Sequence, residues 1–196
     1  MLDHNSVRNA LSFRLGPETI FNGTPLVTLQ VVGMSTIRFA ALEDLGAITQ
    51  IYNEAVVNSV AAFDTEPKTL DEQKSWFANH GSRSPILVAE LDDLIVGWAS
   101  LSKWSDRCAY SDTAEISIYV RQGYRGKGIG KKLIDAILRE VKKVRLHVVI
   151  ARIAEGNDIS MQLHLAVGFE YIGTMKEVGR KFGKFLDVHL LQYTFD

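Results

Sequence analysis

The spacing of apolar residues along the chain predicts a series of strands and helices that begins near residue 36. A period of two indicates half-buried strands, and apolar residues that recur every three or four positions indicate amphipathic helices. The predicted strands are 36–40, 86–91, 95–101, 113–121, 146–150, 169–175 and 185–194, and the predicted helices are 43–56, 70–79, 131–141 and 157–167. A turn at 179–183 is predicted between the last two strands. This order predicts one α/β domain, with a mixed sheet and helices on both of its faces.

Residues 1–33 do not follow this pattern. The stretch 25–33 is apolar but short, and turn-forming residues that include Asn22 precede it. Polar and charged residues near the start interrupt any apolar run of the kind found in secretory signals. We expect one domain at 34–196, preceded by an N-terminal extension of non-native origin at 1–33. A native edge strand is the alternative for this first segment.

Composition and charge limit the possible partners. The chain has 196 residues, of which 46% are hydrophobic and 23% are charged, and its formal net charge is -1. This balance provides no general attraction for nucleic acid or for an anionic membrane, and no apolar run approaches the roughly 20 residues that span a bilayer. The single cysteine, Cys108, excludes an intramolecular disulfide and any multi-cysteine metal site. We expect a cytoplasmic protein with no nucleic-acid partner, no membrane partner and no metal.

A glycine-rich, basic loop at 121–132 connects a predicted strand to a predicted helix. Glycines allow peptide N–H groups to point at an anion without obstruction by Cβ atoms, and the N-terminal end of the following helix adds partial positive charge. The glycines are Gly123, Gly126, Gly128 and Gly130, and the basic residues are Arg121, Arg125, Lys127, Lys131 and Lys132. We interpret the segment as a phosphate-binding loop; a solvated basic turn is the alternative.

Spacing excludes two other nucleotide-binding motifs. A Walker loop requires Lys-Ser/Thr directly after its last glycine, but Ile129 and Gly130 follow Gly128. A dinucleotide fingerprint that begins at Gly126 and Gly128 requires a third glycine at the position of Lys131. It also requires an acidic residue about 20 positions further on at the end of a strand, and the sequence has none there.

The pattern Arg125-x-x-Gly128-x-Gly130 resembles the pyrophosphate-binding motif of the GCN5-related N-acetyltransferase (GNAT) superfamily. The resemblance covers about 36–194 and implies a mixed, mostly antiparallel sheet in which two strands splay apart. It implies acetyl-CoA as co-substrate, with its pantetheine arm paired to the backbone of Ile118, Tyr119 and Val120. The other residues that it implies for acetyl-CoA binding are Arg125, Gly126, Lys127, Gly128, Ile129, Gly130, Lys131 and Asn157.

Further short motifs resemble the phosphinothricin and methionine sulfone/sulfoximine acetyltransferases within this superfamily. These motifs are Ile51-Tyr52-Asn53-Glu54-Ala55-Val56, Trp104 with Arg107-x-x-Tyr110, Glu115, Gly168-Phe169, and Gly179-x-Lys181-Phe182-Gly183-x-x-x-Asp187. The resemblance implies direct transfer of acetyl to the primary amine of a small amino acid or analogue, and it implies a homodimer.

The transfer needs a base, and Glu115 is the candidate, acting through a water. The strand pattern places its side chain opposite the apolar face of 116–120, beside the implied splay. A surface acid in an ion pair is the alternative. Loss of the proton at pH 7 costs about 1 kcal/mol for an α-amine with a pKa near 8, but more than about 4 kcal/mol for a lysine-like amine.

The oxyanion and the departing thiolate also need donors. The backbone N–H of Val120 is the candidate for the oxyanion. His164 occupies a position at which many members of the superfamily carry a tyrosine, and an imidazole with a pKa near 6.5 is able to protonate a thiolate near neutrality. A structural histidine is the alternative. Asn157 is expected to cap the same helix in addition to its implied contact with acetyl-CoA.

Ser105, Asp106 and Arg107 lie in the loop that precedes Glu115, and the resemblance implies that this loop contacts the substrate. An arginine there is able to bind an amino-acid carboxylate through two hydrogen bonds. Lys103 is the alternative for this role. Two other functions stay open from the sequence: acetylation of a protein N-terminus or lysine, and a non-catalytic acyl-CoA-binding sensor.

Overall fold

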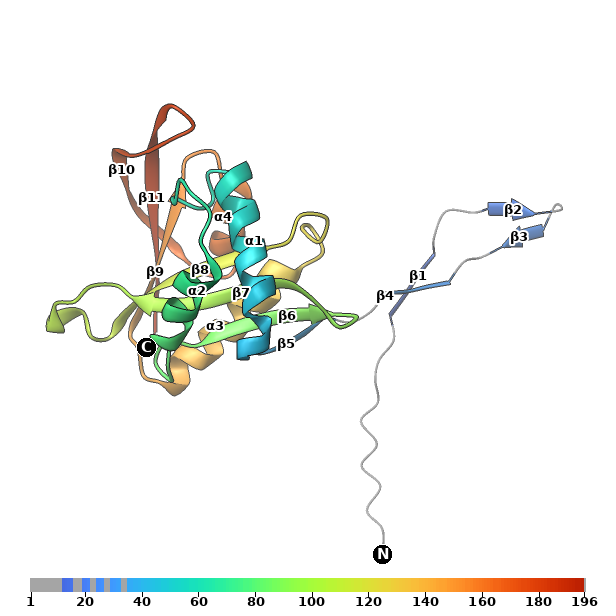
Figure 1. The fold of residues 1–196 in the computed structure, drawn as a ribbon, viewed down its shortest axis with the longest axis horizontal. Helices are drawn as coiled ribbons and strands as arrows, with labels where there is room; N and C mark the ends of the chain where they lie inside the picture. Colours follow the sequence, from blue (N-terminus) through green and yellow to red (C-terminus); the bar gives the residue numbers. More distant parts are fainter. Residues whose placement is uncertain (1–11, 16–18, 22–23, 27–28, 33–34, 196) are drawn as a thin grey trace, which may run out of the picture.

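The computed structural model describes residues 12–15, 19–21, 24–26, 29–32 and 35–195. In this part of the chain, seven strands form one sheet in the order β10-β11-β9-β8-β7-β6-β5 (Figure 1). Neighbouring strands are antiparallel except for β8 and β9, which are parallel. The strands are β5 (Thr36–Phe39), β6 (Ile86–Leu91), β7 (Leu94–Lys103), β8 (Thr113–Val120), β9 (Val148–Ala154), β10 (Glu170–Lys181) and β11 (Lys184–Thr194).

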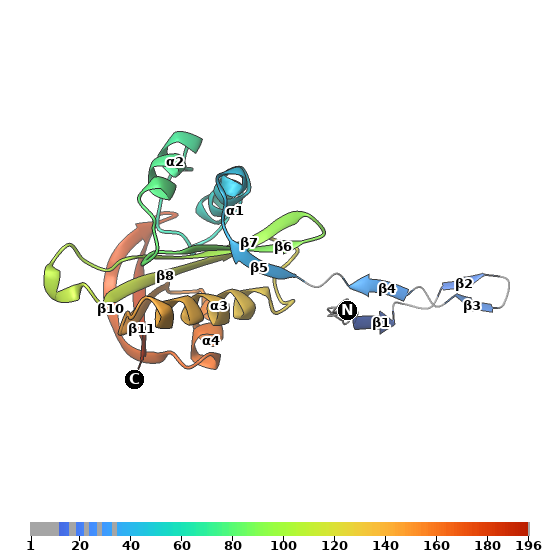
Figure 2. The same cartoon turned by 90° about the horizontal axis from the view of Figure 1, so that it is seen from below.

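Helices cover both faces of the sheet (Figure 2). They are α1 (Leu45–Asn58) and α2 (Leu70–Ala78) on one face, and α3 (Ile129–Lys143) and α4 (Asp158–Ala166) on the other. The apolar stripe of α3 explains its position, because Leu133, Ile134 and Ile137 are fully buried in the main core cluster. Burial of one such side chain contributes about 1.5–3 kcal/mol to stability. Within the described ranges, no helix has the length and apolar character needed to cross a membrane.

The predicted order of strands and helices is confirmed between residues 36 and 194. The extent of β9 differs from the prediction, since it begins two residues later and continues to Ala154. The continuation follows from its partner: Ala154 pairs with Val188 of β11. Strand pairing with a distant segment therefore decides where β9 ends.

The hairpin of β10 and β11 also differs from the prediction. β10 continues to Lys181, so the predicted turn at 179–183 is reduced to the two residues between the strands. A bulge in β10 makes this possible. The Asp187 carboxylate on β11 accepts hydrogen bonds from Lys176 Nζ (2.6 Å) and from the Glu177 N–H (2.9 Å), which holds the irregular residues against the neighbouring strand.

Four short strands precede the sheet. β1 (Ser12–Leu15) pairs with β4 (Leu29–Val32), and β2 (Thr19–Phe21) pairs with β3 (Thr24–Leu26). Among the described residues these strands pair with one another and not with the sheet of seven. The predicted domain boundary at 33–34 lies outside the described residues. The assignment of 1–33 as an extension therefore stays a prediction.

Candidate active site

The sheet opens between its two parallel strands. β8 pairs with β9 only over Thr113–Glu115, opposite Val148–Ile150. Beyond these residues β8 continues along β7, and β9 continues along β11. The splay implied by the resemblance is therefore confirmed by the strand register.

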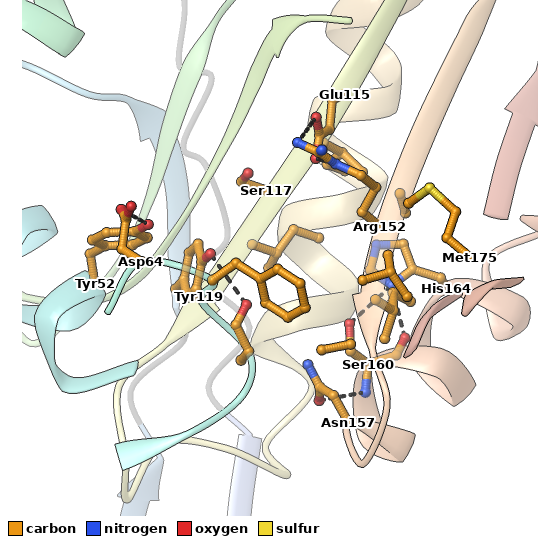
Figure 3. A pocket seen from close by; sticks show the side chains of 18 of the residues that line it. Tyr52, Asp64, Glu115, Ser117, Tyr119, Arg152, Asn157, Ser160, His164 and Met175 are labelled. Carbon is orange, nitrogen blue, oxygen red and sulfur yellow. Dashed lines mark hydrogen bonds and ion pairs between the residues drawn. The ribbon is translucent and has the colours of Figure 1, made fainter. Parts of the chain in front are cut away.

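A cavity of about 510 Å³ lies at this opening (Figure 3). Its walls come from α1 and the segment that follows it, and from β8, β9, α4, β10 and β11. The side chains or backbone of five residues predicted from the sequence line it: Glu115, Ile118, Tyr119, Asn157 and His164. The fold thus brings together predicted residues from β8 and from α4 with its N-cap, which are separate in the sequence.

The register of β8 directs particular peptide groups into the opening. The Arg121 N–H donates to a carbonyl of β7 (2.9 Å). Hydrogen-bonding direction alternates along an antiparallel pair, so the peptide groups of Tyr119 also face β7, whereas those of Ile118 and Val120 face the open side. The Val120 C=O accepts a hydrogen bond from Arg125 Nε on that side (3.0 Å). The Val120 N–H is oriented in the same direction, as an oxyanion donor must be.

The glycine-rich loop leads from β8 into α3. Gly123, Gly126 and Gly128 have φ angles of +86°, +74° and +78°, which L side chains rarely adopt. Gly128 caps α3, and a hydrogen bond runs from the Lys132 N–H back to the Gly128 C=O (3.1 Å). The N–H groups between these residues point out of the helix end, which is the arrangement that binds anions.

The lysine side chains of this loop are exposed and engaged with neighbours on the surface. Lys131 Nζ pairs with Asp135 (2.7 Å), and Lys127 Nζ lies 5.0 Å from the centre of the Tyr124 ring. At this helix end, the donors that face outward are therefore backbone amides, and the lysines add positive charge around them.

Close packing of α3 and α4 depends on Gly130. A Cβ atom at this position would lie 2.8 Å from Leu163 Cδ2 on α4. Asn157 is the N-cap of α4, and its Oδ1 accepts a hydrogen bond from the Ser160 N–H (3.4 Å). The predicted N-cap is confirmed, and the same side chain lines the cavity.

His164 lies on α4 at the cavity wall and is 4% exposed. Its Nδ1 donates to the Ser160 C=O (2.8 Å), so Nδ1 carries the proton and Nε2 is an acceptor. Nε2 is buried and has no hydrogen-bond partner in the described part of the chain. Burial lowers the pKa of the imidazole, an effect that the Ser160 hydrogen bond opposes. The ring is neutral at pH 7 and presents an unprotonated nitrogen.

Glu115 lies where β8 and β9 part. Its carboxylate oxygens accept hydrogen bonds from Arg152 Nε (2.6 Å) and Arg152 Nη2 (2.7 Å) (Figure 3). The Glu115 side chain is 15% exposed and that of Arg152 is 51% exposed. The ion pair considered as the alternative for Glu115 is therefore present, and it lies inside the cavity. Sequence reasoning missed Arg152; a charged residue within the apolar run 146–153 was the available signal.

A second cavity of about 350 Å³ adjoins the first on the side of α1 and α2. The two cavities share four lining residues: Tyr52, Asp64, Ser117 and Tyr119. The Tyr52 hydroxyl donates to Asp64 (2.6 Å), and burial raises the pKa of this phenol, so it stays protonated. Trp98 packs 4.8 Å from Tyr119, measured between ring centres. The second cavity thus offers aromatic surface beside polar groups.

The loop between β7 and β8 extends away from the sheet (Figure 1). Asp106 pairs with Lys103 (3.1 Å), and Ser105 Oγ accepts a hydrogen bond from the Arg107 N–H (3.3 Å). Neither cavity is lined by Ser105, Asp106 or Arg107. Their role in substrate binding stays a prediction. The loop contacts the site through Trp104, whose ring centre is 5.7 Å from the guanidinium carbon of Arg152.

Comparison with known proteins finds a matching family and relatives that are acetyltransferases. The acetyltransferase (GNAT) domain family matches residues 37–190. The sequence is 38% identical over 164 residues to an L-methionine sulfoximine/L-methionine sulfone acetyltransferase from Pseudomonas aeruginosa. That similarity covers 83% of this chain and 95% of the other protein.

Two solved structures resemble this one closely. A phosphinothricin acetyltransferase from Sinorhizobium meliloti, in complex with acetyl-CoA, has a TM-score of 0.80 at 36% identity, over 82% of this chain and 88% of its own. A ribosomal-protein-alanine N-acetyltransferase from Brucella melitensis has a TM-score of 0.80 at 37% identity, over 82% of this chain and 99% of its own.

Proposed function

Because the chain belongs to the GNAT superfamily of acetyltransferases, we propose that it acetylates the α-amine of a free amino acid or a close analogue. Its co-substrate is acetyl-CoA. Methionine sulfone, methionine sulfoximine and phosphinothricin are the acceptors that we expect, since relatives of this chain carry those names. The observation that supports the proposal most is the cavity at the splay, where the same strand, β8, carries the Glu115 carboxylate and a Val120 N–H that faces the opening.

We assign acetyl-CoA to the opening between β8 and β9. The peptide groups of Ile118 and Val120 are oriented to pair with its pantetheine arm, with Tyr119 between them. Residues 125–131 supply amide donors and positive charge for its pyrophosphate, and Asn157 lines the opposite wall. The positive φ angles of the loop support this fit, because they leave its N–H groups uncovered.

In the proposed reaction the acceptor arrives as an ammonium ion and must lose a proton before its nitrogen attacks the thioester carbonyl carbon. Glu115 takes this proton through a water. The Val120 N–H stabilises the carbonyl oxygen as it gains negative charge. The C–N bond forms, the C–S bond breaks and the thiolate gains a proton. The products are the N-acetylated amine, the CoA thiol and one proton released to solvent.

We propose that His164 carries a proton to the thiolate in two steps. Its neutral ring has no proton on Nε2, so Nε2 must first accept one that the amine releases and then donate it to the sulfur. A structural histidine is the alternative. His164→Gln tests the choice: a proton carrier loses kcat with an unchanged KM for acetyl-CoA, whereas a structural residue loses thermal stability without that separation.

An amine panel with acetyl-CoA, read by thiol release, tests the class of acceptor. We expect turnover of methionine sulfone and phosphinothricin, and none of peptides with a free N-terminal alanine. Turnover of the peptides alone would overturn the proposal in favour of a protein N-terminus as acceptor.

A second measurement separates an enzyme from an acyl-CoA-binding sensor. Glu115→Gln is expected to lower kcat by about 10²- to 10⁴-fold, the usual contribution of a general base, while CoA affinity stays unchanged. If the wild-type protein binds acetyl-CoA but acetylates no amine, the sensor function replaces the enzymatic one.

We further propose that the protein is a cytoplasmic homodimer. Around its turn, the β10–β11 hairpin exposes three large apolar side chains: Val178 (55%), Phe182 (58%) and Phe185 (62%). An exposed group of this kind is typical of an interaction surface. β10 is also the last strand in the sheet order, so a second copy has access to this end of the molecule.

A further inference from the structure

Arg152 lines the cavity, and neither the sequence motifs nor the proposed chemistry uses it. It lies on β9, two residues beyond Ile150, the last β9 residue that pairs with β8. Its side chain therefore crosses the mouth of the splay to reach Glu115 on β8. About half of the Arg152 side chain stays exposed, at 51%. The ion pair with Glu115 therefore holds the guanidinium in place, while part of the side chain stays accessible from the cavity.

The geometry of the pair leaves part of the guanidinium unused. An arginine side chain has five N–H donors in a rigid planar fork, and it can bind a carboxylate on more than one edge. The bonds to Glu115 use the Nε and Nη2 side of this fork, which leaves the Nη1 side for a second acceptor. The ring of Trp104, 5.7 Å away, helps to keep the guanidinium in place.

We infer that Arg152 binds the α-carboxylate of the acceptor amino acid, while Glu115 faces its ammonium group. This inference rests on the proposed function. A free α-amino acid carries one positive and one negative group two bonds apart on the same carbon. The Glu115–Arg152 pair presents the opposite charges side by side, so both ends of the zwitterion find a partner. Binding of the carboxylate would place the amine next to the base that takes its proton.

Other basic residues fit this role less well. Arg107, the candidate from the sequence, lines neither cavity. Lys181 Nζ donates to the Ala62 C=O (2.5 Å), and Lys68 pairs with Asp64 (3.3 Å). Both lysines are also compact charges without the planar fork that matches a carboxylate. Arg152 combines the fork, the access and the neighbouring base.

The test compares two acceptors that differ in the carboxylate alone. They are methionine sulfone and 3-(methylsulfonyl)propan-1-amine, the same molecule without its carboxylate. We measure kcat/KM for both with the wild-type protein and with Arg152→Met. Loss of a charge-assisted, two-bond contact is expected to lower kcat/KM for methionine sulfone by about 10- to 100-fold more than for the amine. The quantity compared is the acceptor ratio, which is kcat/KM for methionine sulfone divided by kcat/KM for the amine. The effect of leaving Glu115 unpaired acts on both acceptors and cancels within this ratio. The difference in basicity between the two amines is the same for both proteins and cancels when their ratios are compared.

Three further variants make the result specific. Arg152→Lys keeps the charge without the fork and is expected to restore only part of the ratio. Arg139→Met removes an exposed arginine from α3, remote from the cavity lining, and is expected to leave the ratio unchanged. Arg107→Met tests the competing loop residue. Calorimetry of CoA binding and thermal melting confirm that each variant is folded.

Two outcomes would overturn the inference while the proposed function stands. In the first, Arg152→Met has the same acceptor ratio as the wild type. In the second, Arg107→Met loses the preference for methionine sulfone over the amine. A wild-type protein that acetylates peptides but no free amino acid would overturn the proposed function, and this inference with it.

Discussion

His164 illustrates how the surroundings of a single residue set its chemistry. From the sequence, an imidazole near its ordinary pKa was predicted to donate a proton. In the structure, burial lowers that pKa and the Ser160 C=O holds the ring proton on Nδ1. The nitrogen at the cavity wall is therefore an acceptor in the resting protein.

This state predicts a pH dependence of stability. Because the folded pKa of His164 lies below the ordinary value near 6.5, the unfolded chain binds the proton at a higher pH than the folded protein does. The contribution to stability is complete above about pH 6.5 and is lost as pH falls toward the folded pKa. The free energy of urea unfolding, measured at pH 7.5 and at pH 5.5, tests this contribution. The difference between the two pH values should be smaller in His164→Gln than in the wild type. Burial also lowers the pKa of His80, so part of the pH dependence of stability would remain in the variant. If the free energy of unfolding changes equally between the two pH values in the wild type and in His164→Gln, the prediction is wrong.

Residues that belong to a motif within one element could be placed in the site from the sequence. Asn157 and His164 were expected there from the family resemblance, and Glu115 from that resemblance together with the pattern of one strand. Arg152 could not be placed in this way. Its role depends on a partner 37 residues away and on the register between β8 and β9, which a local pattern does not contain.

At the scale of elements, the periodicity predicted every strand and α-helix between residues 36 and 194, since each burial pattern is local, but not the short 3-10 helix Cys108–Tyr110 in the segment predicted as a loop. The lengths of β9 and β10 were not predicted, because pairing with β11 and the contacts of Asp187 decide them. The splay was expected from resemblance alone. Apolar periodicity indicates that a strand is buried but not where its pairing with a neighbour stops.

The contact between α3 and α4 gives a prediction at this scale. Gly130→Val would place a side chain where a Cβ atom already lies 2.8 Å from Leu163 Cδ2, so Leu163 must repack and the contact between α3 and α4 is disturbed. We expect a loss of about 1–3 kcal/mol in the free energy of unfolding, as is usual for overpacking. Because Asn157 caps α4 and the helix carries His164, acetyl-CoA affinity should fall by about tenfold or more, equivalent to about 1.4 kcal/mol.

Gly46→Ala is the matched control for this variant. Gly46 lies in α1, and a Cβ atom there meets nothing within 4 Å. Alanine in a helix is favoured over glycine by about 0.5–1 kcal/mol, so stability should rise slightly and acetyl-CoA affinity should not change. Equal acetyl-CoA affinities for Gly130→Val and the wild type would show that the spacing of the two helices is not needed for binding.

At the scale of the whole molecule, the proposed active site and the proposed interface are centred on different parts of the sheet. The splay is between central strands, whereas the exposed apolar hairpin is at the end with β10. The hairpin also contacts the cavity, because Met175 and Val178 of β10 line it. An interface there would complete the wall around the substrate as well as hold two copies together.

The dimer can be tested with charges on the hairpin. The double variant Phe182→Glu and Phe185→Glu places two carboxylates on side chains that are 58% and 62% exposed. A dimer that buries this surface should dissociate, because unpaired buried charges are strongly unfavourable. Light scattering coupled to size exclusion is expected to give twice the chain mass of 21.9 kDa for the wild type and that mass for the variant. A monomeric wild type would exclude the proposal.

In the described chain, three residue pairs join β8 to β9 across the middle of the sheet. A pantetheine arm that pairs with β8 would act as an additional strand at this seam. A ligand that binds the folded chain alone raises the free energy of unfolding by about 2.7 kcal/mol when its concentration is 100 times its Kd. The protein's resistance to proteolysis would then rise and fall with the supply of acetyl-CoA, which couples the lifetime of the enzyme to the metabolic state of the cell.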